Sequence, residues 1–285
     1  MLSDNGFHTA YIGKWHLDGG DYFGNGICPE GWDEKYWYDM RRYLEEMNDE
    51  DRIWSRKPEI MKQRKVMEEF IYGHKCSDKA IDFLARNNDE DFLLIVSYDE
   101  PHHPFVCPEP YSSMYQNYEF PKSPNVWDRL KDKPEHQKAW AGDKIKEDKD
   151  TLKIKHPYYF GCNSYVDHEI GRVLEAVDSY APDALVIYTS DHGDMLHSHS
   201  MNNKGAVMYE EIIGIPLIIR WPEITPSGTV CSRIVSHIDL APTIFQAVGL
   251  PVPKLLEGKS IMGTLRDPEE KTKDAVFIEF GRYEI

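Results

Sequence analysis

The amino-acid sequence predicts an α/β fold in which a mostly parallel sheet is covered by helices. Three short apolar segments lead to this prediction, at residues 92–97, 184–188 and 216–220. Each has the continuous apolar character of a strand that is buried on both faces. A helical pattern separates the first two segments, and the order strand, crossover helix, strand is typical of parallel sheets.

The first part of the chain predicts one further strand and a helical region. The end of a helix turns at Asn5-Gly6 into a strand over Thr9–Ile12, and a glycine-rich loop follows. A helical pattern with heavily charged faces runs from Met40 to about Arg86. Its last helix is expected to begin at Ser77 or Asp78 and to bury the side chains of Ala80, Ile81, Phe83 and Leu84.

The second part of the chain predicts two helices and a final strand. A charged stretch with several prolines, Pro121 to Pro157, leads into a helix from about Tyr159 to Ser179. A short helix follows from Asp239 to Val248, capped by Ser236 or Asp239, and a strand is expected from Ala275 to Phe280. The side chains expected to face inward from the longer helix are Val166, Ile170, Val173, Leu174 and Val177.

The charge of the chain narrows the classes of partner. Its 285 residues include 33 Lys and Arg against 49 Asp and Glu, which gives a formal net charge of -16. Such a balance argues against a nucleic-acid surface or an anionic membrane surface, so an anionic substrate needs a locally positive pocket. The five cysteines show no C-x-x-C pair, which argues against a zinc knuckle or a disulfide framework. The sequence makes no prediction about localisation or oligomeric state.

Adjacent Asp191 and His192 form the most informative segment. They follow a predicted strand within Ser190-Asp191-His192-Gly193, and ligands of open α/β sheets bind outside the carboxyl ends of strands. Carboxylate oxygen and imidazole nitrogen both bind divalent metals. The alternative is that Asp191 caps the next turn and His192 is its hydrogen-bonded neighbour.

Two other segments place cations and imidazoles after predicted strands. In Gly13-Lys14-Trp15-His16, the side chains of Lys14 and His16 would point the same way in an extended chain and could grip a tetrahedral oxyanion. In Pro101-His102-His103-Pro104, two imidazoles lie in a loop stiffened by prolines. His102 and His103 are therefore candidates for acid–base work or anion contact, with a purely structural role as the alternative.

A fourth segment follows the Asp-His pair. It contains His199 and Lys204-Gly205, and it leads into Tyr209-Glu210-Glu211. A lysine before glycine can approach a bound phosphate or sulfate as a point charge, whereas the alternative is a solvated surface lysine.

Taken together and in this order, the segments resemble the sulfatase family of the alkaline-phosphatase-like superfamily. The stretch from Gly6 to Leu17 is similar to the family's second signature, and Pro-His-x-Pro-Phe and Ser-Asp-His-Gly recur at 101–105 and 190–193. The resemblance implies an alkaline-phosphatase-like fold, a mostly parallel mixed sheet sandwiched by helices, over a single sulfatase-like domain at residues 1–285.

The resemblance also implies roles for individual residues. Lys14 and His16 correspond to residues that contact the sulfate and the nucleophile, and Lys204 corresponds to a second sulfate-contacting lysine. His102 corresponds to the histidine that contacts the substrate or protonates the leaving group. His199 corresponds to a pocket contact. The metal ligands correspond to Asp191 and His192.

The chain departs from the family pattern upstream of Lys14. Family members carry metal-binding aspartates and then Cys-x-Pro-x-Arg or Ser-x-Pro-x-Arg, whose first residue becomes the formylglycine nucleophile, and neither occurs here. The nearest similar segment, Cys231-Ser232-Arg233, lacks the proline, and Asp4 is too close to Lys14 to replace the aspartates. We therefore expect a sequence that is truncated at its N-terminus and at its C-terminus, and a 285-residue chain that is inactive alone.

The implied activity of the complete protein is hydrolysis of a sulfate monoester, on a small molecule or a carbohydrate. The implied cofactors are formylglycine and a divalent metal, Ca²⁺ first, with Mn²⁺ and Mg²⁺ as alternatives because imidazole is softer than the ligands that Ca²⁺ prefers. Two other functions stay open. One is hydrolysis of phosphonate monoesters or phosphodiesters, and the other is a sulfatase-like binding protein without catalysis.

Overall fold

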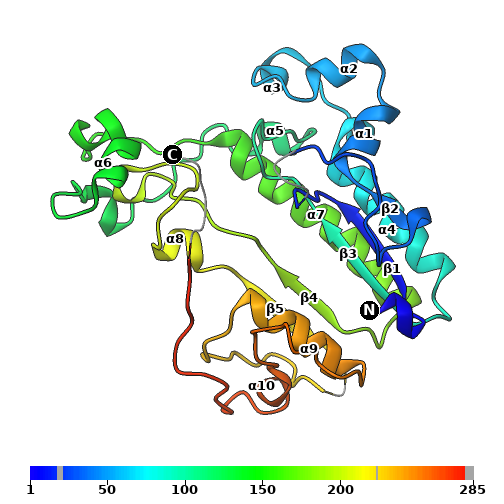
Figure 1. The fold of residues 1–285 in the computed structure, drawn as a ribbon. Coiled ribbons are helices and arrows are strands. Elements are labelled where there is room, and N and C mark those ends of the chain that lie inside the picture. The colour runs from blue at the N-terminus through cyan, green and yellow to red at the C-terminus, as the bar shows by residue number, and fades with distance from the viewer. Residues whose placement is uncertain (18–21, 223, 280–285) are drawn as a thin grey trace. The chain divides into compact units, whose positions relative to one another are not determined.

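The computed structural model describes residues 1–17, 22–222 and 224–279, and the chain divides into two compact units. Unit 1 comprises Met1–Pro121 and Lys153–Pro182, and unit 2 comprises Lys122–Leu152 and Asp183–Ile285. Figure 1 shows the elements of both units in chain order. None of the helices in the described residues has the length and apolar character that crossing a lipid bilayer requires.

The sheet of unit 1 has three parallel strands in the order β2-β1-β3. They are β1 (His8–Gly13), β2 (Trp37–Tyr38) and β3 (Phe92–Ser97). Strand β1 lies in the middle and is buried over five of its six residues, which follows from its having a partner on each edge. Because Gly13 pairs with Ser97, the carboxyl ends of β1 and β3 are level, and the loops after these strands begin side by side.

The N-terminal turn has the predicted form. A short 3₁₀ helix, η1 (Ser3–Asn5), ends at Gly6, whose φ of 86° is in the left-handed region that favours glycine. The chain then enters β1 one residue earlier than predicted.

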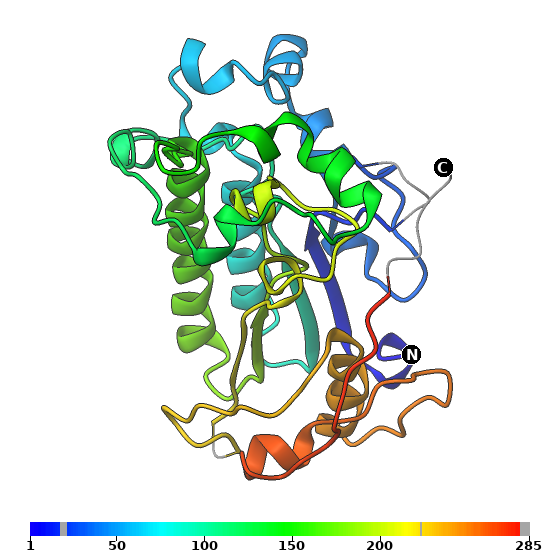
Figure 2. The same ribbon diagram turned by 90° about the vertical axis from the view of Figure 1, so that its left-hand side faces the viewer.

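Helices pack against this sheet in two successive layers. Helix α4 packs on β1 and β3, and the long helix α7 packs on α4 and on α5, as Figure 2 shows for the cyan and green helices beside the blue strand. The helices of unit 1 are α1 (Met40–Glu46), α2 (Asp49–Trp54), α3 (Ile60–Gln63), α4 (Tyr72–Arg86), α5 (Tyr111–Met114) and α7 (Pro157–Tyr180), with 3₁₀ turns η2 (Glu34–Tyr36) and η3 (Glu68–Phe70).

The predicted start of α4 was wrong. The helix begins at Tyr72, so Ser77 and Asp78 lie inside it and do not cap it. The Ser77 hydroxyl donates to the Glu169 carbonyl oxygen at 3.3 Å, and Asp78 pairs with Arg172 at 2.6 Å. These polar side chains therefore tie α4 to α7. The predicted inward residues Ala80, Phe83 and Leu84 are buried, and Ile81 is half-buried.

The most deeply buried residues of helix α7 overlap only in part with the half-buried apolar face that spacing predicts. Of the five apolar residues expected to face inward, only Val177 is fully buried. The side chain of Glu169 is 1% exposed, and its carboxylate binds His74 at 2.9 Å and Arg172 at 2.6 Å. A buried charge of this kind is stable only when it is paired and hydrogen-bonded.

The two remaining predicted strands pair with each other. In unit 2, β4 (Val186–Thr189) and β5 (Leu217–Arg220) form a two-stranded antiparallel sheet. The prediction that all three apolar segments are buried on both faces was therefore wrong, since Tyr188 is 41% exposed and Ile218 is 63% exposed. Among the described strands, β3 and β4 do not pair, so α7 is not a crossover helix within one described sheet.

Short helices make up the rest of unit 2. The Ser236 and Asp239 side chains form a reciprocal capping box, as the predicted caps suggested. Residues 275–279 are irregular, so the strand predicted there does not form, and Phe280 lies outside the described residues. The helical segments are η4 (Pro124–Trp127), α6 (Glu135–Ala141), η5 (Gly142–Lys146), η6 (Ser198–Ser200), α8 (Glu210–Ile213), η7 (His237–Asp239), α9 (Leu240–Ala247) and α10 (Met262–Arg266).

Candidate active site

Lys14 is placed by the close approach of β1 to β3. A Cβ atom added to Gly13 would lie 1.9 Å from the Ser97 carbonyl oxygen, and Gly13 has φ of 128°, so only glycine fits there. The Lys14 amide then donates to the same Ser97 oxygen at 2.8 Å. The Lys14 ammonium lies 3.4 Å from the Asp99 carboxylate, which comes from the loop after β3. Two strand ends thus bring a cation and a carboxylate together.

His16 does not lie beside Lys14 in extended chain, as the sequence predicted. Its φ is 48°, in the left-handed region, so the alternation of side chains along a strand does not apply. The His16 ring instead packs edge-on against the Tyr22 ring, with centroids 5.4 Å apart. Lys14 and His16 still contact a common side chain, because the Lys14 ammonium lies 4.9 Å from the centroid of the Tyr22 ring.

His102 is held by the loop that follows β3. Its amide donates to the Asp99 carbonyl oxygen at 2.8 Å, and its carbonyl oxygen accepts from the Phe105 amide at 3.0 Å. Its ring Nδ1 lies 3.0 Å from the His103 carbonyl oxygen. Because a carbonyl only accepts, Nδ1 carries the proton of the neutral ring, and Nε2 is the nitrogen that gains or loses one. The His103 ring packs on Phe105 at 5.5 Å.

Tyr22, Asp99 and Arg56 belong to this cluster, and the motifs did not predict them. The Tyr22 hydroxyl donates to Asp99, and the Tyr22 ring lies 5.0 Å from the His102 ring. The Arg56 guanidinium lies 3.3 Å from Asp99 and 4.8 Å from the Tyr22 ring centroid. Lys14, Arg56 and Asp99 together carry one net positive charge. This local positive charge is what an anionic substrate requires on a chain that is acidic as a whole.

A small cavity of about 30 Å³ opens beside this cluster, between Arg56, Asp99, Glu100 and His102. Burial, and then the nearby Asp99 carboxylate, raise the pKa of Glu100 to about 7. One carboxyl oxygen of Glu100 accepts from the Gly73 amide at 3.1 Å, while Oε2 has no hydrogen-bond partner among the described residues. The cavity therefore contains a carboxyl group whose pKa lies near neutral pH.

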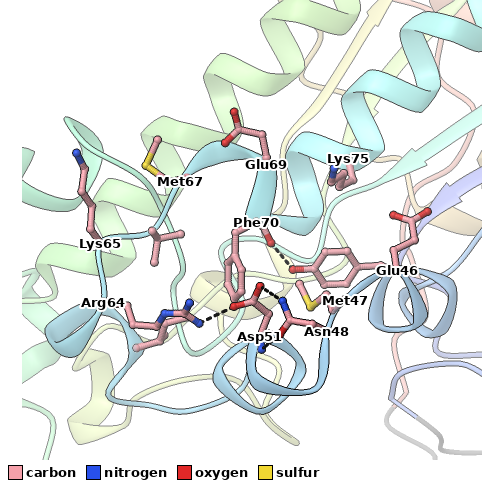
Figure 3. A pocket seen from close by; sticks show the side chains of 13 residues that line it. Glu46, Met47, Asn48, Asp51, Arg64, Lys65, Met67, Glu69, Phe70 and Lys75 are labelled. Atoms are coloured by element: carbon pink, nitrogen blue, oxygen red, sulfur yellow. Dashed lines mark hydrogen bonds and ion pairs between the residues drawn. The ribbon is translucent and has the colours of Figure 1, made fainter.

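A larger cavity of about 400 Å³ lies elsewhere in unit 1, where α1, α2, α3 and η3 meet (Figure 3). It shares Tyr43 and Phe70 with the small cavity, and the Tyr43 hydroxyl donates to the Phe70 carbonyl oxygen. Among the described residues that line it, none was predicted to bind sulfate. Its charged side chains balance, three acidic against three basic: Glu46, Asp51, Glu69, Arg64, Lys65 and Lys75.

Asp191 and His192 follow β4 in unit 2, as predicted. The Asp191 carboxylate accepts from the His192 amide at 2.9 Å, and its other oxygen lies 3.4 Å from His192 Nε2. The Gly193 carbonyl oxygen lies 2.8 Å from His192 Nδ1, which places the ring proton there. A Cβ atom on Gly193 would lie 2.0 Å from the Glu211 carbonyl oxygen, so glycine is required at this position too.

These two side chains fit part of a metal site. A ligating histidine commonly donates its second ring N–H to a carbonyl, as His192 does to Gly193, and its Nε2 then faces a carboxylate oxygen of Asp191 at a separation that one cation can bridge. Within residues 1–17, 22–222 and 224–279, however, no group of three or more His, Cys, Asp or Glu is arranged to hold a metal ion. Asp191 and His192 are therefore an incomplete ligand set.

His199 lies in a strained loop of unit 2. Leu196, His197, His199, Ser200 and Asn203 all have positive φ, and non-glycine residues with this backbone conformation concentrate at functional sites.

The position of His199 is fixed by packing and hydrogen bonding. Its Nδ1 binds Asp128 at 2.7 Å, and its ring stacks on Tyr209 with centroids 3.8 Å apart. Burial raises the pKa of Asp128, but the hydrogen bonds from His199 and the Leu130 amide and the charges of His199 and Lys133 together outweigh it, so the pKa lies below its usual range. Lys204 is exposed at the end of the same loop.

Comparison with solved structures shows the fold class of this chain. A phosphonate monoester hydrolase, SpPMH from Silicibacter pomeroyi, matches with a TM-score of 0.73 at 21% identity, over 96% of this chain and 62% of that one. The structure of BT4656 in complex with its substrate D-Glucosamine-2-N, 6-O-disulfate matches with a TM-score of 0.68 at 21% identity, over 96% and 65%. These likenesses show the fold alone and confirm the predicted alkaline-phosphatase-like class.

The sequence comparisons then show the family. A family model described as Sulfatase matches residues 1–250. The chain is 42% identical over 291 aligned residues to a protein of Escherichia coli (strain K12) described as the uncharacterized sulfatase YidJ, over 100% of this chain and 57% of the relative. The chain belongs to the sulfatase family. It spans about half the length of the curated relatives it matches, 57%, 43% and 57% for three of them.

Proposed function

We propose that this chain is the core of a sulfuric-ester hydrolase that cleaves a sulfate monoester of a carbohydrate or another small molecule. The observation that supports this most strongly is the cluster at the carboxyl ends of β1 and β3. There, the Lys14 ammonium and the His16 and His102 rings surround one tyrosine ring in a site with excess positive charge. This arrangement suits the binding of a tetrahedral oxyanion with a proton donor beside it.

In the proposed reaction, Lys14 neutralises negative charge on the sulfate oxygens, and Lys204 would act as a second cation. Charge withdrawal favours attack at sulfur as the bond to the leaving oxygen breaks. His102 would pass a proton from Nε2 to the departing alcohol oxygen, with Nδ1 oriented by the His103 carbonyl. His199, held by Asp128, would be a further substrate contact.

The proposal includes two groups that the family pattern implies. A divalent metal, Ca²⁺ first, with Mn²⁺ and Mg²⁺ as alternatives, would neutralise sulfate charge when bound, and Asp191 and His192 would supply two of its ligands. A formylglycine would supply the nucleophile, and the 285 residues contain no Cys-x-Pro-x-Arg or Ser-x-Pro-x-Arg from which it forms. We therefore expect the 285-residue chain alone to be inactive.

The class of substrate is proposed from one relative in fold. BT4656 binds D-Glucosamine-2-N, 6-O-disulfate, a sulfated amino sugar, as its substrate. A sulfated carbohydrate is consistent with a site that combines cations with aromatic rings, since sugars pack on rings while their sulfates bind cations.

The test compares two esters with the same leaving group, 4-nitrophenyl sulfate and a 4-nitrophenyl phosphonate monoester. The enzyme is expressed from the gene with all in-frame sequence around codons 1–285, and the 285-residue chain is assayed in parallel. We expect the longer product to favour the sulfate by about 100-fold or more in kcat/KM, and the 285-residue chain to show no turnover.

The outcomes separate the three candidate functions. Preference for the phosphonate would overturn the proposal in favour of a phosphonate monoester hydrolase. Absence of turnover by every product, with retained affinity for sulfate esters in calorimetry, would overturn it in favour of a binding protein. Turnover by the 285-residue chain would contradict the expectation that a nucleophile from outside these residues is required.

A further inference from the structure

One tyrosine contacts the residues of unit 1 to which the family resemblance assigns a role in the reaction, Lys14, His16 and His102. The Tyr22 ring lies 4.9 Å from the Lys14 ammonium, 5.4 Å from the His16 ring and 5.0 Å from the His102 ring. These three residues come from two loops that are separated by more than 80 residues of sequence. The loop that carries Lys14 and the loop that carries His102 therefore both contact the Tyr22 ring.

The hydroxyl group of Tyr22 is also held in place. Its hydroxyl donates to Asp99, and the same carboxylate pairs with Lys14 at 3.4 Å and with Arg56 at 3.3 Å. The Asp99 side chain is 8% exposed, so these contacts are little weakened by solvent. Burial, and then the Asp99 charge, raise the pKa of Tyr22, which keeps the phenol neutral and able to donate.

We infer that Tyr22 is a positioning residue that holds Lys14, His16 and His102 in one arrangement, with its ring oriented by the hydrogen bond to Asp99. The inference rests on the proposed function for the reaction that the three residues serve. It assigns no chemistry to Tyr22, whose neutral phenol is already committed to the Asp99 carboxylate.

The physical reason is the freedom that these side chains would otherwise have. A lysine ammonium ends a flexible four-carbon stem, and an imidazole on a loop turns about two torsions. A cation over an aromatic face and a ring–ring contact, edge-on for His16 and tilted for His102, each contribute about 1 kcal/mol, enough to favour one rotamer over others. Small displacements of reacting groups are costly in catalysis, about 100-fold for 1 Å.

The first test measures how the rate depends on the leaving group. The longer gene product is assayed on a series of aryl sulfates whose phenols span several units of pKa. In Y22L, which loses the ring, we expect kcat/KM to fall about 100-fold for the poorest leaving group and less than tenfold for the best, because a displaced His102 matters most when protonation is needed. In Y22F, which keeps the ring, losses should stay below tenfold and be confined to poor leaving groups.

Y36L is the matched control. Tyr36 is also a partly buried tyrosine of unit 1, its ring packs on Phe83 at 4.8 Å, and its hydroxyl binds Asn87 at 3.1 Å. We expect Y36L to lower the rate for all leaving groups by one factor, if at all. A uniform loss in Y22L, parallel to that of Y36L, would overturn the inference. If Y22L does not fold, Y22F decides the test, and a Y22F profile identical to the parent for every leaving group overturns it.

A second test needs no activity, so it separates this inference from the proposed function. Imidazole ¹H–¹⁵N correlation spectra of the 285-residue chain report the order of the His16 and His102 rings. We expect one sharp set of signals for each ring in the parent and in Y36L, and broadened or doubled signals for both rings in Y22L. Signals of His16 and His102 that are the same in Y22L as in the parent would overturn the inference, whatever esters the longer product hydrolyses.

Discussion

Each unit contains some of the predicted site residues, and the two groups of residues are held in very different ways. In unit 1, the Tyr22 cluster consists of Lys14, His16, Tyr22, Asp99 and His102. Its charged side chains have little exposure, 15% for Lys14 and 8% for Asp99, while Tyr22 and His102 are half-buried and His16 is exposed. Its members contact one another across two loops. In unit 2, the Asp191 side chain is 73% exposed and the His192 side chain 33%, and within the described residues both bond to their immediate chain neighbours.

The difference concerns preorganisation. The Tyr22 cluster is fixed by contacts between residues far apart in sequence, so an oxyanion would meet groups that are already oriented. The Asp191–His192 pair is fixed only locally, and its ligand set is incomplete among the described residues. We therefore expect substitutions in unit 1 to have large effects by themselves, and substitutions in the pair to have small effects in this chain.

The largest effect is expected from Lys14→Met in the longer gene product. The substitution removes the cation and leaves Asp99 to repel the sulfate, so kcat/KM for an aryl sulfate should fall by about 1,000-fold or more. The control is Lys57→Met, since the Lys57 ammonium lies over the Trp54 ring and is not part of the cluster. Steady-state kinetics check this, and a loss of less than tenfold would show that the cluster does not bind the reacting sulfate.

The next largest effect is expected at Glu169, which ties helix α7 to helix α4. Glu169→Ala leaves His74 and Arg172 without their buried partner, which should cost about 3 kcal/mol of unfolding free energy. The Ser77 hydroxyl lies 2.9 Å from the Tyr98 hydroxyl, and Tyr98 precedes Asp99 in the chain. The contact between α4 and α7 therefore supports the loop that carries Asp99. Urea unfolding at pH 7 measures the loss, and Glu175→Ala on the exposed face of α7 should change stability by less than about 0.5 kcal/mol.

The cost of Glu169→Ala should also depend on pH. Burial raises the pKa of Glu169, but hydrogen bonds from His74, Ser77 and Arg172 and the Arg172 charge together outweigh it and lower the pKa below its ordinary value of 4.5. A lowered folded-state pKa stabilises the protein above 4.5, and this stabilisation is lost as pH falls through the folded-state pKa. The difference between Glu169→Ala and the parent should therefore shrink in acid. A constant difference from neutral to acidic pH would contradict this.

An effect of similar size and opposite sign is expected from Glu100→Gln. The pKa of Glu100 in the folded chain is about 7 against an ordinary 4.5, so folding binds a proton between these values and stability falls as pH rises. Gln cannot ionise, so the variant should be more stable than the parent by about 3 kcal/mol at pH 8 and nearly equal at pH 4. Urea unfolding of the parent and the variant at pH 8 and at pH 4 measures this difference in stability. An equal difference at both would show that the carboxyl does not titrate there.

The sequence predicted those parts of the site that depend on short spacing. Lys14 and His102 each follow a strand, and the parallel register of Gly13 with Ser97 places them at one sheet edge, as the motifs implied. Tyr22 and Arg56 were missed because their contacts are not local. Tyr22 lies in a glycine-rich loop without periodicity, and Arg56 lies in a charged region whose pattern is typical of a solvated surface. The sequence shows that Arg56 is positively charged, but it does not show that Asp99 is its partner.

The sequence also could not predict which strands pair. Apolar runs indicate burial, but they do not identify the neighbouring strand, and residues 186–189 pair antiparallel with 217–220 instead of extending the sheet of unit 1. In α7, buried Glu169 was missed because a charged residue is expected on the solvent face unless a partner is known. Its partner His74 lies 95 residues away.

The smallest effect, and the sharpest test of the comparison, is expected at Asp191. Ca²⁺ requires six to eight oxygen ligands, and the described residues place only one carboxylate beside His192, so Ca²⁺ should bind the 285-residue chain with Kd near 1 mM or weaker. Asp191→Asn should then weaken binding by no more than about tenfold. The control is Asp194→Asn, whose carboxylate accepts from the Leu196 amide at 2.9 Å. Calorimetric titration that gives micromolar Kd would show that the Asp191–His192 pair is as preorganised as the Tyr22 cluster, and the comparison between the two units would fail.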